Sequence, residues 1–242
     1  MLKAPSIAPP TRATRLGILA IAFIICGTTA YLAARYASLP DLLPVHFWPN
    51  GFPNGWQFKT TARVLVPVFV QVALTFTLGA IGALLLSRPH VSDGSGNVAH
   101  APDIRAAAVA AEAVILITLI WVAFQAYAAW ALVRMWTAER AGLGPWYDYL
   151  EYTGAIVTLV VSVRAHQRLG RPEPRPFVAR HWRFGQLYRN PDDPALFVPT
   201  RDGRRWTLNF GRPIAAALLG IILLLGVVGP TVILGLLLRG GS

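Results

Sequence analysis

Hydrophobic residues are concentrated in a few long runs along the chain, and polar stretches separate these runs. Four runs exceed the roughly 20 residues that a helix needs to cross about 30 Å of hydrocarbon. They are Leu16–Ala37, Val64–Leu86, about Ala106–Val133 and Pro213–Leu238. We therefore expect each of them to be a transmembrane helix.

A fifth apolar run is shorter than these four. Only Tyr152–Val163 lies between charged residues there, which corresponds to about 18 Å of helix at 1.5 Å per residue. Trp146, Tyr147 and Tyr149 precede it, and aromatic side chains gather at membrane–water interfaces. We expect this run to be the fourth of five crossings.

The distribution of basic residues predicts the orientation of the five helices. With the N-terminus inside the cell, sixteen Lys and Arg residues face the cytoplasm and six face outward. An excess of Lys and Arg on the cytoplasmic side is the usual pattern in membrane proteins. Eleven of these arginines lie in residues 164–212, and all would move outside if Tyr152–Val163 did not cross. We expect the N-terminus inside and the C-terminus outside.

The composition agrees with a membrane protein. Hydrophobic residues make up 55% of the 242 residues and charged residues only 14%, whereas about one quarter of a soluble domain is charged. The net charge of +11 comes mostly from the basic cytosolic stretch, so we expect no nucleic-acid partner. The single cysteine, Cys26, lies in the first run and excludes an intramolecular disulfide.

The fold class that these patterns predict is an all-α polytopic membrane protein with five transmembrane helices and a small cytosolic β-meander between helices 4 and 5. The predicted parts are a cytosolic N-terminus (1–15), a two-helix domain (16–86) with a structured outer loop (38–62), a flexible inner loop (87–104), helices 3 and 4 (105–163), a basic cytosolic segment (164–212) and helix 5 (213–239).

Glu112 is the only carboxylate inside an apolar run. An acid within a membrane span is by default a functional hypothesis. However, Arg105 precedes Glu112 by seven residues, which is about 10 Å along a helix. Pairing with an arginine near the inner headgroups is therefore the interpretation we favour. The other polar residues singled out inside the runs are Gln71 and Gln125.

The loop between the first two runs is rich in proline, glycine and aromatic residues. Four prolines within fourteen residues exclude a helix there. Pro-Asn-Gly occurs at Pro49–Gly51 and again at Pro53–Gly55, and each triplet predicts a tight turn. We expect a compact, stiff loop that presents aromatic rings and one imidazole. The residues assigned to ligand binding are His46, Phe47, Asn50, Gly51, Asn54, Gly55, Trp56 and Lys59.

A different interpretation of the loop remains open. Aromatic residues are common at membrane interfaces, so the rings could be interfacial anchors and His46 a structural hydrogen-bonding residue. A plain connector would need neither the turns nor this length. The two interpretations are about equally supported by the residues alone.

A motif in this loop resembles the one that follows the first helix in the SdpI-like membrane family of bacteria. Its residues are Pro40-Asp41, Pro44-Val45-His46-Phe47, Gly51, Asn54-Gly55-Trp56 and Lys59, and the match covers about residues 16–86. The best-known members are immunity proteins that protect a cell from its own secreted toxin and signal its presence. The resemblance implies a multi-pass protein of the bacterial plasma (inner) membrane whose outer loop recognises an external peptide, protein or lipid.

The basic segment has the pattern of a linker followed by short strands. Residues 168–180 are rich in proline and arginine and predict an extended linker. We then expect a three-stranded meander built from His181–Tyr188, Ala195–Thr200 and Arg205–Phe210, with an Asp-Gly hairpin turn before the last strand. A tight turn is expected at Asn190, Pro191, Asp192, Asp193 and Pro194.

The same segment resembles a short uncharacterised domain with a Tyr-x-Asn-Pro-x-Asp-Pro core and a closing Trp-Thr-Leu-Asn-Phe. The match spans His181–Arg212 and implies shared architecture without a known activity. A meander of about thirty residues is marginally stable alone. We therefore expect it to dock on the anionic inner leaflet, through the arginines of Arg164–Arg212, or on a cytosolic protein.

The chain carries no catalytic or metal-binding motif of the common kinds, such as a zinc-protease helix, a phosphate-binding loop or a nucleophile elbow. We expect no enzyme activity, no cofactor and no metal site. The leading hypothesis is a membrane protein that binds or senses an external ligand. The alternative is a small membrane transporter or membrane enzyme that uses Glu112 and His46.

Overall fold

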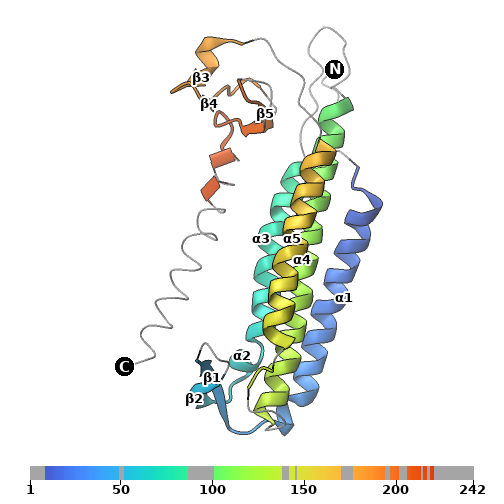
Figure 1. Ribbon diagram of the computed structural model, residues 1–242, viewed down its shortest axis with the longest axis vertical. Coiled ribbons are helices and arrows are strands. Elements are labelled where there is room, and N and C mark those ends of the chain that lie inside the picture. The colour runs from blue at the N-terminus through green and yellow to red at the C-terminus, as the bar shows by residue number, and fades with distance from the viewer. Residues whose placement is uncertain are drawn as a thin grey trace. The chain divides into compact units, whose positions relative to one another are not determined.

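The computed structural model describes residues 9–48, 52–86, 101–137, 142–144, 146–169, 177–193, 197–201, 206–213, 215–216 and 219–220. Its long elements are helices (Figure 1): α1 (Arg12–Arg35), α2 (Thr61–Val64), α3 (Val66–Leu86), α4 (Ala101–Trp136) and α5 (Trp146–Leu169). The strands are short and form three two-stranded sheets: β1 (Leu42–Phe47) with β2 (Pro53–Phe58), β3 (Trp182–Arg183) with β4 (Leu187–Tyr188), and β5 (Phe197–Pro199) with β6 (Trp206–Leu208).

The chain divides into two compact units, and each unit contains parts of the long helices. We call the unit with residues 12–80 and 113–162 the hairpin unit, because it contains β1 and β2. We call the unit with residues 81–112 and 163–237 the basic unit, because it contains β3 to β6 and most of the arginines.

Three helices are long and apolar enough to cross a membrane: Arg12–Ser38, Val66–Leu86 and Ala106–Trp136. They confirm the first three predicted spans. Within the part of the chain that the structure describes, α5 is not among the helices that are long and apolar enough to cross a membrane, although it is one continuous helix over Tyr152–Val163. The fourth crossing and the orientation stay predictions. The predicted inner loop up to residue 100 and most of Pro213–Leu238 lie outside the described residues.

In the hairpin unit, α1, α3 and α4 meet through small and aliphatic side chains. Ile21, Ile115 and Val122 form one buried cluster between α1 and α4. Gly17 permits this contact, because a Cβ there would lie 2.8 Å from Cγ2 of Ile115. Small residues let membrane helices approach closely, and close packing is what holds such helices together.

The buried side chain of Gln71 ties three helices together. Its Nε2 donates one hydrogen bond to Oγ1 of Thr28 on α1 at 3.2 Å and another to the carbonyl oxygen of Val122 on α4 at 3.0 Å. A hydrogen bond between membrane helices contributes about 0.6 kcal/mol on average. Gln71 is therefore an interior polar residue that links α3 to α1 and α4, whereas Gln125 is only half-buried.

In the basic unit, Glu112 of α4 pairs with an arginine, as expected. The partner is Arg168 of α5, whose guanidinium donates a hydrogen bond to the Glu112 carboxylate. The side chain of Arg105, the arginine nearest in sequence, lies outside the described residues. The pairing of Glu112 with an arginine, which the sequence predicted, is therefore present.

The predicted three-stranded meander is wrong in its first strand. His181–Tyr188 is a tight hairpin, in which β3 pairs antiparallel with β4 and the chain turns at Phe184–Gln186. The aromatic alternation suited a strand, but Gly185 adopts a φ of +75°, which glycine reaches at no steric cost. β5 and β6 form the second hairpin as predicted, and a parallel bridge joins Tyr188 to Asn209.

Candidate functional site

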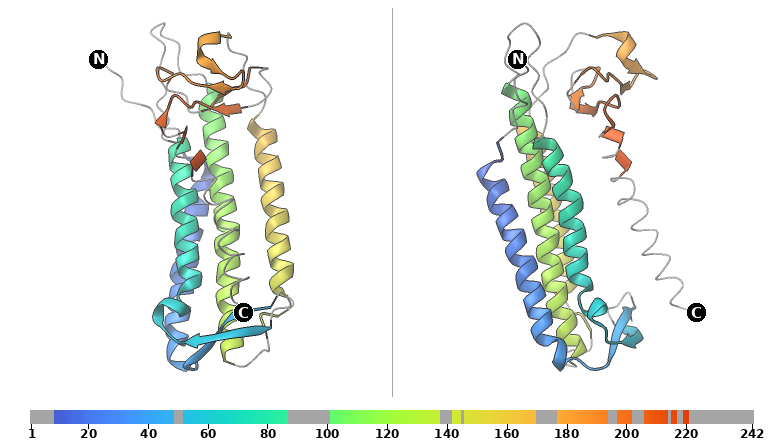
Figure 2. Two further views of the ribbon diagram at one scale, coloured as in Figure 1. Left: turned by 90° about the vertical axis from the view of Figure 1, so that its left-hand side faces the viewer. Right: turned by 180° about the vertical axis from the view of Figure 1, so that it is seen from behind.

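The segment between α1 and α3 is a β-hairpin, which we call the Leu42–Phe58 hairpin. Its two strands pair antiparallel from Leu42 opposite Phe58 to Phe47 opposite Pro53. At the far end the N–H of Trp48 donates to the carbonyl oxygen of Phe52 at 2.8 Å. Residues 49–51 connect these two and lie outside the described residues, so the structure does not place Asn50 or Gly51. Figure 2 shows the hairpin beyond the first residues of α3 and level with the ends of α1 and α4.

The second Pro-Asn-Gly triplet does not form the predicted turn. Pro53, Asn54 and Gly55 belong to β2. The register shifts on both sides of His46, so that Val45 is an extra residue on β1 and Asn54 an extra residue on β2. Such bulges re-aim side chains and strengthen the local twist. The turn signal was misleading because a proline is also tolerated at the first residue of a strand.

Gly55 lies directly opposite His46, and the two residues are in close contact. A Cβ on Gly55 would lie 2.8 Å from the Cβ of His46. Gly55 is not among the described residues with a positive φ, so backbone conformation does not explain the glycine at this position. The close approach of the two strands requires it instead.

Two polar atoms at this part of the hairpin are buried without a hydrogen-bond partner. They are Nδ1 of His46 and Oδ1 of Asn54. A buried polar atom left unpaired costs roughly 1–3 kcal/mol. A bound water or a ligand group that reached these atoms would therefore be stabilised there.

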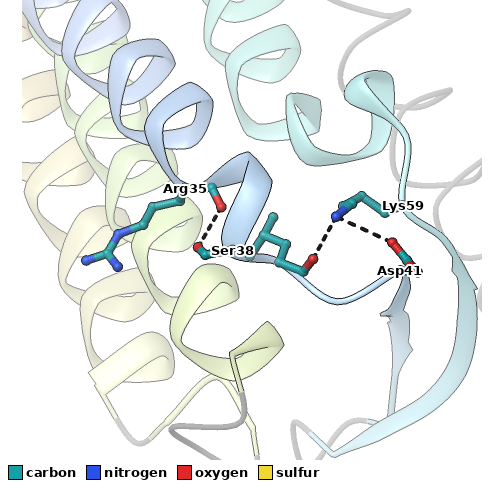
Figure 3. Close-up of polar contacts among 5 residues, drawn as sticks. Arg35, Ser38, Asp41 and Lys59 are labelled. Atoms are coloured by element: carbon teal, nitrogen blue, oxygen red, sulfur yellow. Dashed lines mark hydrogen bonds and ion pairs between the residues drawn. The ribbon is translucent and has the colours of Figure 1, made fainter.

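Lys59 closes the open end of the hairpin (Figure 3). Its Nζ donates to the carbonyl oxygen of Leu39 at 2.7 Å and lies 3.6 Å from Oδ1 of Asp41. The ring centre of Tyr36 lies 5.2 Å from Nζ of Lys59. The Lys59 side chain is 15% exposed and that of Asp41 95%, so the exposed carboxylate contributes little and the carbonyl and ring hold the cation. The Lys59 ammonium is therefore already engaged within the protein.

One face of the hairpin is fastened to the helices. Leu43 is fully buried in a cluster with Leu32, Val64 and Val133, and Val45 and Phe47 pack against the same cluster. Phe47 is thus partly buried rather than presented at the surface.

A further contact, which the sequence patterns did not predict, is the hydrogen bond from Nε1 of Trp136 to the carbonyl oxygen of Pro44 at 2.9 Å. A tryptophan just after an apolar run was the only signal that could have indicated it.

The hairpin also carries large apolar side chains that face outward. Leu42 and Phe58 form one cross-strand pair, and Pro44 and Trp56 form the next pair on the same side. Leu42, Trp48, Phe52, Trp56 and Phe58 are each between 49% and 73% exposed. Trp56 is therefore the residue among those assigned to ligand binding that the structure presents at the surface as predicted.

The turn predicted at residues 190–194 is present over Asn190–Asp193, and hydrogen bonds within the unit hold it. The N–H of Asp192 donates to Oδ1 of Asn190 at 3.1 Å. Oδ1 of the buried Asn209 accepts from the N–H of Asn190 at 3.0 Å, and its Nδ2 donates to the carbonyl oxygens of Asn190 at 2.8 Å and Asp193 at 3.0 Å. Pro194 lies outside the described residues. These contacts give the motif a structural role. We call the hydrogen bonds of Asn209 to Asn190 and Asp193 the clasp.

Comparisons with known proteins cover part of this chain. A sequence model of a domain of unknown function (DUF1648) matches residues 23–70. That segment begins in α1, contains the whole Leu42–Phe58 hairpin and ends in α3. No curated protein and no solved structure matches the chain. Among the described residues, no group of three His, Cys, Asp or Glu side chains is placed to hold a metal ion.

Proposed function

We propose that this protein is a multi-pass protein of the bacterial plasma membrane, of the SdpI-like type, that recognises an external peptide or protein through the Leu42–Phe58 hairpin. The observation that carries the proposal is the contrast between the two parts of the hairpin surface. One part is buried against α1, α3 and α4, and the other exposes large apolar side chains. The biological role would be immunity to, or sensing of, a secreted peptide.

The hairpin is well suited to binding because it is held in place before a ligand arrives. Lys59 closes its open end, Trp136 bonds its first strand, and Gly55 holds His46 between two bulges. Binding to a preorganised surface avoids the entropy cost of ordering a loop. Aromatic side chains are enriched at the centres of protein interfaces, and Trp56 and Phe58 are the strongest candidates for such a centre.

The competing explanation is that the same rings lie in the membrane interface, where tryptophan is enriched. The hairpin is joined to α1 and α3, two helices that can span a membrane, so lipid is close by in either case. Recognition and anchoring differ in what they predict: recognition requires a ligand whose binding depends on the exposed rings, whereas anchoring requires only that the rings stabilise the protein in lipid.

The alternative of a transporter or membrane enzyme that uses Glu112 and His46 stays a prediction. The two residues belong to different compact units. The Glu112 carboxylate is engaged by Arg168, which supports a structural role for it. We therefore place the function at the hairpin alone.

A capture experiment tests the proposal. The full-length protein, reconstituted in nanodiscs, is incubated with the peptide fraction of bacterial culture medium, and retained peptides are identified by mass spectrometry. The variant Trp56→Ser with Phe58→Ser should retain roughly ten-fold less of a specific peptide, because buried aromatic residues dominate such interfaces. The matched control, Trp146→Ser with Tyr149→Ser, changes equally exposed aromatic residues outside the hairpin and should bind normally.

Two results would contradict recognition by the hairpin. One is a peptide that both variants retain equally well. The other is a hairpin variant that reconstitutes poorly or melts earlier while no peptide depends on it, which is the behaviour of a membrane anchor.

A further inference from the structure

The turn between β3 and β4 has an unusual residue at its tip. Phe184 adopts a φ of +50° and Gly185 a φ of +75°, and the N–H of Gln186 donates to the carbonyl oxygen of Arg183 at 3.2 Å. Positive φ at both central residues defines the mirror-image turn of tight hairpins, in which asparagine or glycine is preferred at the first position. A bulky side chain in this conformation is strained. Phe184 is the only residue other than glycine with a positive φ in the described part of the chain.

The same residue is also the most exposed large apolar side chain of the described residues. Phe184 is 95% exposed, so its ring gains no packing within the fold. Neither the turn nor the core of the basic unit therefore explains a phenylalanine at this position. Strained backbone conformations and exposed apolar side chains both tend to mark sites that contact another molecule or a membrane.

The surroundings of Phe184 are basic. Residues 177–191 contain Arg180, Arg183 and Arg189 and no Asp or Glu, and Asp192 and Asp193 follow in the next turn. Arg183 and Arg189 are exposed. Phe177 and Leu187 add further exposed apolar area at 50% and 42%. The tip therefore combines one protruding ring with nearby positive charge.

We propose that the Arg183–Gln186 turn inserts into an anionic lipid leaflet. The ring of Phe184 enters the boundary between headgroups and acyl chains, and Arg183 and Arg189 bind lipid phosphates. Basic residues beside a membrane helix are attracted to anionic lipid, and apolar rings in such segments bury in the same boundary layer. The proposal is independent of the hairpin's function. It adds an apolar insertion point to the electrostatic contact expected for the basic segment.

Lipid fits this turn better than a protein surface does. A stable protein interface buries many residues on each side, whereas one ring flanked by arginines can enter a bilayer without a shaped pocket. The charge next to the ring matches the proposed partner, because Arg183 precedes Phe184 and is exposed. The nearest carboxylates in the sequence, Asp192 and Asp193, belong to the neighbouring turn, and Asp193 accepts a hydrogen bond from the Tyr188 hydroxyl. Phe184 is the first central residue of the turn, and its ring is 95% exposed, so it is not folded back onto the unit.

The experiment uses the full-length protein with Cys26→Ser, which removes its only cysteine. A cysteine is then introduced at Gln186, an exposed position in the turn, and labelled with an environment-sensitive fluorophore. The protein is reconstituted in nanodiscs of phosphatidylcholine alone or mixed with phosphatidylglycerol, with or without spin-labelled lipids that quench at shallow depth. Insertion predicts blue-shifted, quenched emission in the anionic nanodiscs and weak quenching in neutral ones. It should decrease in about 1 M salt, where the Debye length is about 3 Å.

The matched control carries the label at Asp192, an exposed position in the neighbouring turn, which should stay unquenched. Phe184→Asn removes the ring and relieves the turn, so it should fold normally and lower the quenched population at position 186 roughly ten-fold. Phe184→Trp should preserve quenching. The proposal is overturned if the label is equally unquenched in both lipid compositions, if Phe184→Asn leaves quenching unchanged, or if the label is shielded in cell membranes but not in anionic nanodiscs, which would indicate a protein partner.

Discussion

Gly55 and His46 face each other so closely that a Cβ on the glycine would lie 2.8 Å from the Cβ of the histidine. The contact lies between two opposed bulges, at Val45 and Asn54. Both strands therefore depend on the absence of one side chain. The position of His46 in the candidate site is set by a residue that has no side chain of its own.

The first prediction concerns this contact. Gly55→Ala should destabilise the protein by about 1–3 kcal/mol, because overpacking forces the strands apart. Thermal unfolding in detergent measures the effect. Gly79→Ala is the matched control, since nothing lies within 4 Å of a Cβ there, and it should be neutral or slightly stabilising within a helix. Adding His46→Gly to Gly55→Ala should restore part of the stability. An unchanged melting temperature for Gly55→Ala would exclude the close contact.

The second prediction concerns the open end of the hairpin. Lys59→Met removes the donor to the Leu39 carbonyl while keeping the aliphatic part of the side chain. It should cost about 1.5–3 kcal/mol, as is typical of a hydrogen bond to a charged group, and should speed amide hydrogen exchange in β1 and β2. Asp41→Asn is the control: its side chain is 95% exposed, so it should change stability by less than about 0.5 kcal/mol. Equal effects of the two variants would assign the clamp to the ion pair instead.

The third prediction concerns the clasp in the basic unit. Asn209→Ala removes hydrogen bonds to Asn190, Asp193 and Gly211, and each buried group left unpaired costs roughly 1–3 kcal/mol. The variant should make the arginines of residues 180–212 rapidly cleavable by trypsin in the full-length protein. Asp192→Ala, at an exposed position of the same turn, should be cleaved at the wild-type rate. A protected Asn209→Ala protein would show that the hairpins hold together without the clasp.

The fourth prediction concerns topology. In a Cys26→Ser background, the thiol introduced by Asn50→Cys should react with an impermeant maleimide on intact cells. Asp192→Cys should react only after permeabilisation, because five crossings would place the basic segment, residues 164–212, inside. Labelling of the Asp192 position from outside would remove α5 as a crossing and reverse the assignment of the arginines.

The three helices that are long and apolar enough to cross a membrane could be predicted, because the reason for them is local. A run of about 20 apolar residues must satisfy its own backbone hydrogen bonds in lipid, and a helix is the only single segment that does so. The weak fourth run shows the limit of that argument, because α5 has a mixed composition. The four prolines were expected to exclude a helix, and the described residues between Leu42 and Phe58 form two strands instead.

Turn signals were less reliable, since the same residues are compatible with two local structures. Pro53–Gly55 is part of a strand because it pairs with β1. The aromatic alternation of His181–Tyr188 became a hairpin because Phe184 and Gly185 both took positive φ. In each case pairing with another segment decided between conformations that the residues alone allowed.

The sequence by itself determined the apolar helices, the non-helical loop between the first two and the presence of a basic segment rich in turns, because these depend on neighbouring residues. Only the tertiary structure decided that Glu112 pairs with Arg168, that Lys59 holds Leu39 and that Trp136 bonds Pro44. These partners are separated by 56, 20 and 92 residues. Which donor reaches which acceptor over such separations is set by how helices and strands pack, and local composition does not encode it.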